Sequence, residues 1–201
     1  GLITREEAIQ RVLPTHIDQM LHPMIDQKSL KSVKPLGKGL NASPGAACGQ
    51  IVFSAADAES QVKEGRKVLL VRKETSPEDI GGMAVAQGIL TSTGGMTSHA
   101  AVVARGMGTP CVSGAKDVTI IGKSAIIKVK QFKEGDWLTI DGTTGAIYEG
   151  HLPLIAPDHP GVIRRRDGTQ DAIAYDMGRH DTVHSLVLPV LAEGDYFCAV
   201  Q

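Results

Sequence analysis

Short runs of apolar residues alternate with segments of helical periodicity through the middle of the chain. A run of a few apolar residues between turn residues is typical of a buried strand. A helix is predicted over 55–64, because Gly65 supplies the residue that commonly ends one. Ser76-Pro77 predicts a second helix start, and that helix is expected to turn Ile80, Met83 and Ala84 inward. The buried strands predicted in this region are 46–53, 67–72 and 88–93.

The last of these strands leads into a glycine turn and then a third helix of small and branched apolar residues, within 94–108. Beyond it, short strands are predicted at 109–114 and 125–129, followed by two strands around the turn Asp141-Gly142. Strands and helices thus alternate before the terminal strands. This order predicts one α/β domain over residues 36–155.

The two ends of the chain are patterned differently. Residues 1–35 are predicted to form a helical linker arm, because Thr4 and Glu7 make a capping box and the apolar stripes that follow are thin. The glycine-rich boundary at 35–39 is interpreted as a hinge. Residues 156–201 are an extension of uncertain structure; its histidines His180 and His184 lack the glutamate of a zinc-protease motif, so no metal site is predicted.

Composition and charge narrow the possible partners. The chain has 201 residues, of which 42% are hydrophobic, and a formal net charge of -1. A near-neutral chain has no long-range attraction for nucleic acid or an anionic membrane. No apolar run approaches the ~18 residues of a membrane span. We therefore predict neither nucleic acid nor a membrane as a partner.

The three cysteines, Cys48, Cys111 and Cys198, lie far apart and lack the paired spacing of a zinc site. Each is interpreted as a small buried hydrophobe in a reducing compartment, either the cytoplasm or an organelle with a reducing interior. The chain begins without methionine and without the apolar stretch of a signal peptide. It is therefore expected to have been cut from a longer protein.

The candidate chemistry lies where the third helix begins. Main-chain N–H groups at a helix start lack partners and the helix dipole is positive there, so a phosphoryl group would be stabilised. Gly95 would let the backbone approach the phosphate, and Thr97 and Ser98 offer hydroxyl donors. His99, in the first turn, supplies a nucleophilic nitrogen, and the dipole favours its neutral form.

The same residues have simpler interpretations. From spacing alone, Ser98 could be only a helix cap and His99 only a satisfied residue of the first turn. A serine nucleophile is less favoured, because Ser98 and His99 are adjacent and no G-x-S-x-G motif is present. Arg105, six residues beyond His99, is expected on another helix face and is left without a role.

The run 94–108, with Thr97-Ser98-His99 at its centre, resembles the phosphohistidine signature of the pyruvate, phosphate dikinase family. That family belongs to the phosphoenolpyruvate-utilising enzymes, with phosphoenolpyruvate synthase and enzyme I of the sugar phosphotransferase system. Met96 favours the dikinase, because both relatives typically carry arginine there, and the synthase typically has cysteine in place of Ser98. The resemblance extends over about residues 1–155, through 39–49, 74–80 and the arm, and ends after Ala156.

The resemblance implies a swivelling β/β/α domain with His99 as its phosphoryl carrier. It also implies that the intact enzyme converts ATP, phosphate and pyruvate to AMP, pyrophosphate and phosphoenolpyruvate. The expected partners are an N-terminal ATP-grasp domain and a C-terminal phosphoenolpyruvate/pyruvate-binding barrel of a homo-oligomeric parent. Mg²⁺ is expected on those other domains, with no cofactor in this chain. Thr97 aligns with the threonine that is phosphorylated in plant enzymes.

Two alternatives stay open at this point. The chain could be the equivalent carrier domain of phosphoenolpyruvate synthase, or a non-catalytic module that binds phosphate or another protein. As the carrier domain of a dikinase, the isolated chain is expected to be inactive for the full reaction, because 201 residues cannot hold the other domains as well.

Overall fold

The computed structural model describes residues 22–156 without a gap, and outside them residues 4, 7, 10–11, 162–164, 185–186 and 196–199. The chain divides into two compact units, residues 1–156 and 157–201. In the second unit β14 (Val162–Arg164) and β15 (Ser185–Leu186) both pair antiparallel with β16 (Tyr196–Ala199). The histidine pair considered for a metal, His180 and His184, lies outside the described residues.

The first unit is built on an eight-stranded mixed sheet in the order β2-β12-β11-β4-β5-β6-β7-β3. Its four central strands, β4 to β7, run parallel, and the outer strands pair antiparallel. The predicted buried strands are confirmed, since β4, β5 and β6 fall within or nearly within their expected ranges. The strands are β2 (Gly37–Lys38), β3 (Leu40–Ser43), β4 (Ala46–Val52), β5 (Val68–Arg72), β6 (Gly88–Thr91), β7 (Cys111–Ser113), β11 (Trp137–Asp141) and β12 (Ala146–Glu149).

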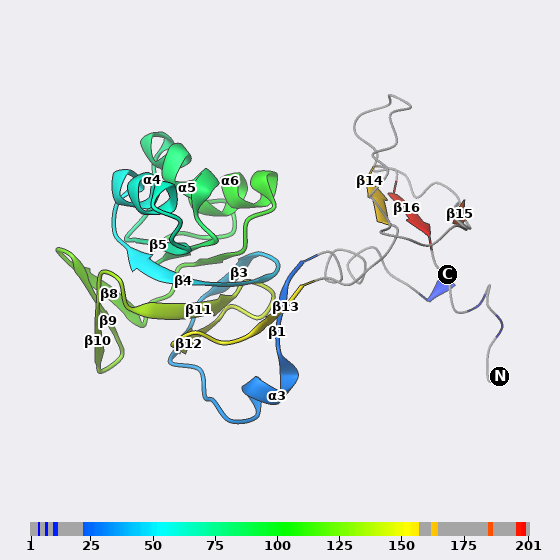
Figure 1. Ribbon diagram of the computed structural model, residues 1–201, viewed down its shortest axis with the longest axis horizontal. Helices are drawn as coiled ribbons and strands as arrows, with labels where there is room; N and C mark the ends of the chain where they lie inside the picture. Colours follow the sequence, from blue (N-terminus) through cyan, green and yellow to red (C-terminus); the bar gives the residue numbers. More distant parts are fainter. Residues whose placement is uncertain are drawn as a thin grey trace. The chain divides into compact units, whose positions relative to one another are not determined.

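All three crossover helices cover the same face of this sheet (Figure 1). They are α4 (Ala55–Lys63), α5 (Ile80–Val85) and α6 (His99–Met107). Parallel strands that follow one another in a single direction, with right-handed crossovers, place every helix on one side. The helices pack through small residues, among them Ala58, Ala100, Ala101 and Ala104, against Val52, Val68, Leu70 and Ile89 of the sheet.

A second, smaller sheet covers the opposite face. Its order is β10-β9-β8, with β8 (Val118–Ile121), β9 (Ser124–Ile127) and β10 (Lys130–Lys133), all antiparallel. Val118, Ala125, Ile127 and Phe132 of this sheet are buried against Ile51, Leu69, Val71, Leu138, Ile140 and Ile147 of the large one. The layers are therefore sheet, sheet and helices, which confirms the β/β/α architecture expected from the resemblance.

The segment 35–39 is not the free hinge that the sequence suggested. Gly37 and Lys38 form β2 and pair with Ile147 and Ala146 of β12, and the Gly39 N–H donates to the Gly145 carbonyl at 2.8 Å. A hinge needs backbone torsions that can rotate, and these are held in a sheet edge. The hinge prediction is therefore wrong for these residues.

The segment 24–33 of the predicted arm also packs on the domain. The strand β1 (Met24–Ile25) pairs with β13 (Leu154–Ile155), and α3 (Gln27–Leu30) follows it. Ile25 is buried against Ala46, Tyr148 and Leu152, in a small core that a sequence pattern this thin did not reveal. At the start of the chain the capping box is confirmed: the Glu7 N–H donates to Thr4 Oγ1 and the Thr4 N–H donates to Glu7 Oε2.

The helix after Ser76-Pro77 turns a different face inward from the one expected. Met83 is fully buried, but Ile80 is 41% exposed and Ala84 is exposed. The segment opens with a 3₁₀ turn over Pro77–Asp79 before α5 begins. A 3₁₀ turn has three residues per turn, so it rotates the phase of the residues that follow.

Among the described glycines, Gly142, in the turn between β11 and β12, leaves the least room for a Cβ. We expect Gly142→Ala to lower the free energy of unfolding by about 1–3 kcal/mol. A Cβ at Gly142 would lie 1.9 Å from the Ser43 carbonyl oxygen, a backbone atom that cannot rotate away. Gly106→Ala is the control, because its Cβ would meet nothing within 4 Å and alanine favours a helix. Urea unfolding of the two variants checks this, and equal stability would contradict it.

Candidate functional site

The carboxyl ends of three neighbouring parallel strands bring the candidate residues together. β5, β6 and β7 are adjacent in the sheet, so their carboxyl ends meet at one edge, where open α/β sheets bind ligands. The loop before His99 follows β6, Thr75 follows β5, and Ser113 ends β7. Residues far apart in sequence therefore face one another here.

His99 is the first residue of α6, and its ring is held by Thr75. The Thr75 hydroxyl lies 3.0 Å from Nδ1 of His99, and Thr75 is itself buried at 8% exposure. In the described part of the chain, Nε2 of His99 has no hydrogen-bond partner. The ring is therefore fixed through one nitrogen, while the other remains available to a reactant.

The position of Thr75 is set by the helix start that follows it. The Ser76 N–H donates to Asp79 Oδ2 at 2.9 Å, and Arg72 at the end of β5 lies 3.4 Å from the Asp79 carboxylate. Asp79 is 5% exposed, so this pairing locks the segment to the sheet edge. No motif or spacing in the sequence assigned a role to Thr75. A hydroxyl just beyond a buried strand, beside the strand that leads to His99, was the signal that could have found it.

The two glycines of the turn, Gly94 and Gly95, differ in backbone conformation and in the space around them. Gly94 adopts a φ of +107°, and a Cβ there would lie 3.0 Å from Ser98 and 3.1 Å from the Ser113 hydroxyl. A Cβ on Gly95 would meet no atom within 4 Å, so the space beside this residue is open. Gly94 therefore shapes the turn, and the space next to Gly95 is open.

Ser98 begins the helix as its N-cap. Its hydroxyl accepts from the Ala101 N–H at 3.4 Å, and the Val102 N–H donates to the Ser98 carbonyl at 3.0 Å. Within the described residues, the main-chain N–H groups of His99 and Ala100 have no acceptor. Thr97, just before the cap, is exposed.

Arg105 reaches the loop that precedes His99, although its spacing suggested another face. Its Nε donates to the Ala101 carbonyl at 3.2 Å, one helical turn back, and its Nη2 donates to the Met96 carbonyl. The side chain thus folds along α6 toward the helix start. Spacing places the Cα of a residue, but a long side chain can cross a full turn, and only the structure shows where it ends.

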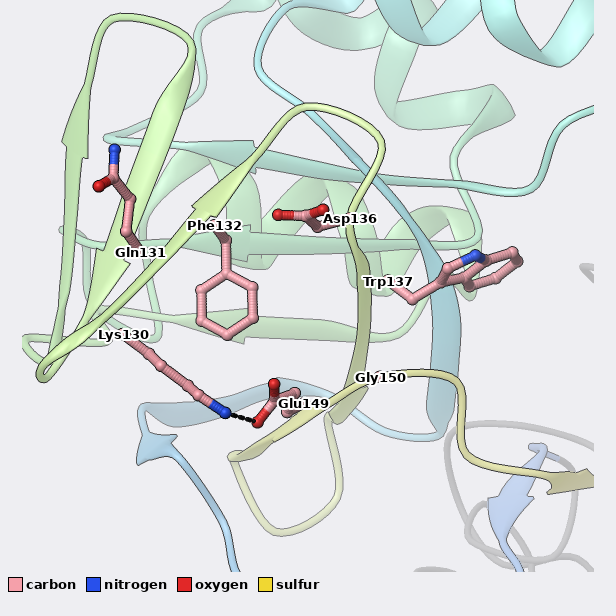
Figure 2. A pocket seen from close by; sticks show the side chains of 7 residues that line it. All are labelled: Lys130, Gln131, Phe132, Asp136, Trp137, Glu149 and Gly150. Atoms are coloured by element: carbon pink, nitrogen blue, oxygen red, sulfur yellow. Dashed lines mark hydrogen bonds and ion pairs between the residues drawn. The ribbon is translucent and has the colours of Figure 1, made fainter.

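Other polar features lie away from this edge. Figure 2 shows a hollow beside β10, β11 and β12, where Lys130 and Glu149 form an ion pair and the Trp137 ring points away from them. None of the seven residues that line it is a predicted site residue. No group of metal-ligating side chains and no helix able to cross a membrane is found in the described part of the chain.

Two cysteines take the buried positions that the sequence predicted. Cys48 and Cys111 are buried and carry free thiols, and burial raises the pKa of both, that of Cys111 to about 12. A thiol with so high a pKa stays protonated at neutral pH and is a poor nucleophile. The side chain of Cys198 is not among those described.

Comparison with known proteins agrees with this site. Residues 64–145, which contain Thr75, the glycine turn and His99, match the family described as PEP-utilising enzyme, mobile domain. The chain therefore contains the mobile domain of the phosphoenolpyruvate-utilising enzymes.

Its relatives narrow the class to one enzyme. The chain is 53% identical over 163 residues to the pyruvate, phosphate dikinase of Rhizobium meliloti (strain 1021). This match covers 80% of the chain and 18% of the relative. It is 55% identical over 159 residues to the enzyme of Entamoeba histolytica, and 52% identical over 159 residues to pyruvate, phosphate dikinase 2 of Oryza sativa subsp. japonica; each match covers 78% of the chain and 18% of the relative. The chain is thus homologous to a fragment of pyruvate, phosphate dikinase, and phosphoenolpyruvate synthase is not favoured.

Proposed function

We propose that His99 carries a phosphoryl group on Nε2 for a pyruvate, phosphate dikinase reaction. The contact that supports this is the one between Nδ1 and the Thr75 hydroxyl, at 3.0 Å. With its proton on Nδ1 and donated to Thr75, the ring keeps the Nε2 lone pair for attack on phosphorus. Thr75 also stabilises the positive charge that the ring gains as the new bond forms.

The proposed reaction has three transfers. Nε2 attacks the β-phosphorus of ATP, the bond from that phosphorus to the α-phosphate bridging oxygen breaks, and AMP leaves. Inorganic phosphate then takes the terminal phosphoryl group from the histidine and departs as pyrophosphate. Finally the oxygen of the pyruvate enolate takes the remaining phosphoryl group, which gives phosphoenolpyruvate and restores His99.

The N–H groups and hydroxyls around His99 are proposed to hold the phosphoryl oxygens. The N–H groups of His99 and Ala100 point from a helix start, where negative charge is favoured. Gly95 leaves space for the group, and Thr97 and Ser98 offer hydroxyls. A phosphate on Thr97 would place negative charge beside His99 and repel an incoming phosphoryl group, so Thr97 is a proposed control point.

The matches cover only 18% of each relative, so we assign the binding of ATP, of pyruvate and of Mg²⁺ to regions outside this chain. We propose an N-terminal ATP-grasp domain, a C-terminal barrel that binds pyruvate and phosphoenolpyruvate, and Mg²⁺ bound on those domains. The β/β/α domain would swivel between the two sites, in a homo-oligomeric enzyme. His99 would need to be accessible from solvent for both encounters, as its place at an open sheet edge allows.

The test is to incubate the full-length parent protein with Mg²⁺ and ATP that is radiolabelled at the β-phosphate. We expect acid-labile, base-stable label in the peptide that contains His99, discharged when inorganic phosphate and pyruvate are added together. Label on another residue, or none, would overturn the proposal and favour a non-catalytic module. Dependence of turnover on inorganic phosphate separates the dikinase from the synthase, which releases phosphate instead.

A further inference from the structure

Ser113, the last residue of β7, lies directly beneath the glycine turn and has no role in the function proposed so far. Ser113 is fully buried, as is Thr91 on the neighbouring strand β6. A Cβ on Gly114 would lie 2.4 Å from the Gly94 carbonyl oxygen, so the turn rests directly on the end of β7. A serine in this place can act on the turn without reaching solvent.

Three hydroxyls form a continuous line from the sheet to the start of α6. Thr91 Oγ1 donates its proton to the Thr93 carbonyl at 2.8 Å and lies 3.3 Å from Ser113 Oγ. Ser113 Oγ in turn lies 3.3 Å from Ser98 Oγ. The line ends at the cap of the helix that carries His99.

The number of protons and lone pairs limits what each hydroxyl can do. A serine hydroxyl has one proton and accepts through two lone pairs. Ser98 Oγ already accepts from the Ala101 N–H. If Ser113 donates its proton to Ser98, both lone pairs of Ser98 are used and the Ser98 proton can only be donated outward.

We propose that Ser113 is a positioning residue, which donates to Ser98 and so directs the Ser98 proton toward the phosphoryl group on His99. Thr91 has a single proton, which goes to the nearer Thr93 carbonyl, so Thr91 supports Ser113 from the sheet only by contact, at 3.3 Å. A donor already aimed at the transferring group stabilises its oxygens without reorganisation during the reaction. This inference rests on the proposed carrier function of His99.

The experiment uses this chain alone, with phosphoramidate as a small phosphoryl donor. Histidine nitrogen bonds to phosphorus as the phosphorus–nitrogen bond of the donor breaks and ammonia leaves. The rate at His99 is followed by peptide mass spectrometry relative to His151, which is exposed and has its ring 4.7 Å from that of Trp137. His151 thus reports the general reactivity of the reagent in each variant.

We expect Ser113→Ala to slow phosphorylation of His99 roughly tenfold relative to His151, the equivalent of one hydrogen bond. Ser98→Ala should slow it by a similar factor, and the double variant should be no slower than Ser98→Ala alone, because Ser113 acts only through Ser98. Ser113→Cys, which keeps the size but donates weakly, should fall between. Ser124→Ala, on β9, is the control and should leave the ratio unchanged.

The outcomes separate the two proposals. If wild-type His99 takes no phosphate, the carrier function fails and the role of Ser113 fails with it. If His99 reacts in the wild type, and reacts as fast relative to His151 in Ser113→Ala or Ser113→Cys as it does in the wild type, only the Ser113 proposal is overturned. Effects of Ser98→Ala and Ser113→Ala that multiply in the double variant would also overturn it, because they would show that the two residues act independently.

Discussion

Replacing His99 by alanine is expected to lower phosphorylation of the domain by ATP at least about a thousandfold, because alanine has no nucleophile to replace Nε2. In the full-length protein, His99→Ala should take no acid-labile label from ATP and should form no phosphoenolpyruvate. The measurement is the amount of label per chain after acid and base treatment.

The matched control is His151→Ala, which removes an exposed histidine outside the site. It should leave the label and the rate of phosphoenolpyruvate formation unchanged. The fold should survive His99→Ala, because His99 is only half-buried, Ser98 still caps α6 and the alanines of that helix still pack on the sheet. Label that persists in His99→Ala would show that the carrier is another residue.

The second large effect is expected for Thr75→Val, which keeps the size of the side chain but removes the hydroxyl 3.0 Å from Nδ1 of His99. Without this partner the proton is free to move to Nε2, where it blocks attack on phosphorus. We expect phosphorylation of His99 to slow by about 10-fold to 100-fold, the cost of one or two hydrogen bonds.

Thr75→Ser should restore most of the rate, because serine keeps the hydroxyl. Nitrogen-15 NMR of the ring distinguishes positioning from general damage: the wild type should carry its proton on Nδ1, and Thr75→Val should shift the population toward Nε2. A slow Thr75→Val variant whose proton still lies on Nδ1 would contradict this role for Thr75.

Local patterns in the sequence were sufficient for the elements that carry the site. Ser98, His99 and the small apolar residues after them predict a capped helix that packs on a sheet, and α6 has that form. Buried strands were also predicted well, because β4, β5 and β6 are apolar runs bounded by turn residues. A helix cap and an apolar run between turn residues are local features, so the sequence alone can predict them.

The edge strands and the small sheet were harder to predict. β2 lies in the glycine-rich segment that was interpreted as a hinge, and no strand was predicted for the residues of β3. β8 and β10 have no clear alternation of polar and apolar residues. Such strands are stabilised by the partner strand more than by their own composition. Their existence therefore depends on pairings between distant segments.

The sequence by itself determined that His99 lies at a helix start, after a glycine turn and the Ser98 cap. It also determined that the run 94–108 resembles one enzyme family. Only the tertiary structure decided that Thr75 holds the ring, that Ser113 lies beneath the cap and that Arg105 reaches back to the Met96 carbonyl. The physical reason is that parallel strands bring their carboxyl ends to one edge. Residues separated by a whole strand and helix then meet within hydrogen-bond distance, and no local spacing records that meeting.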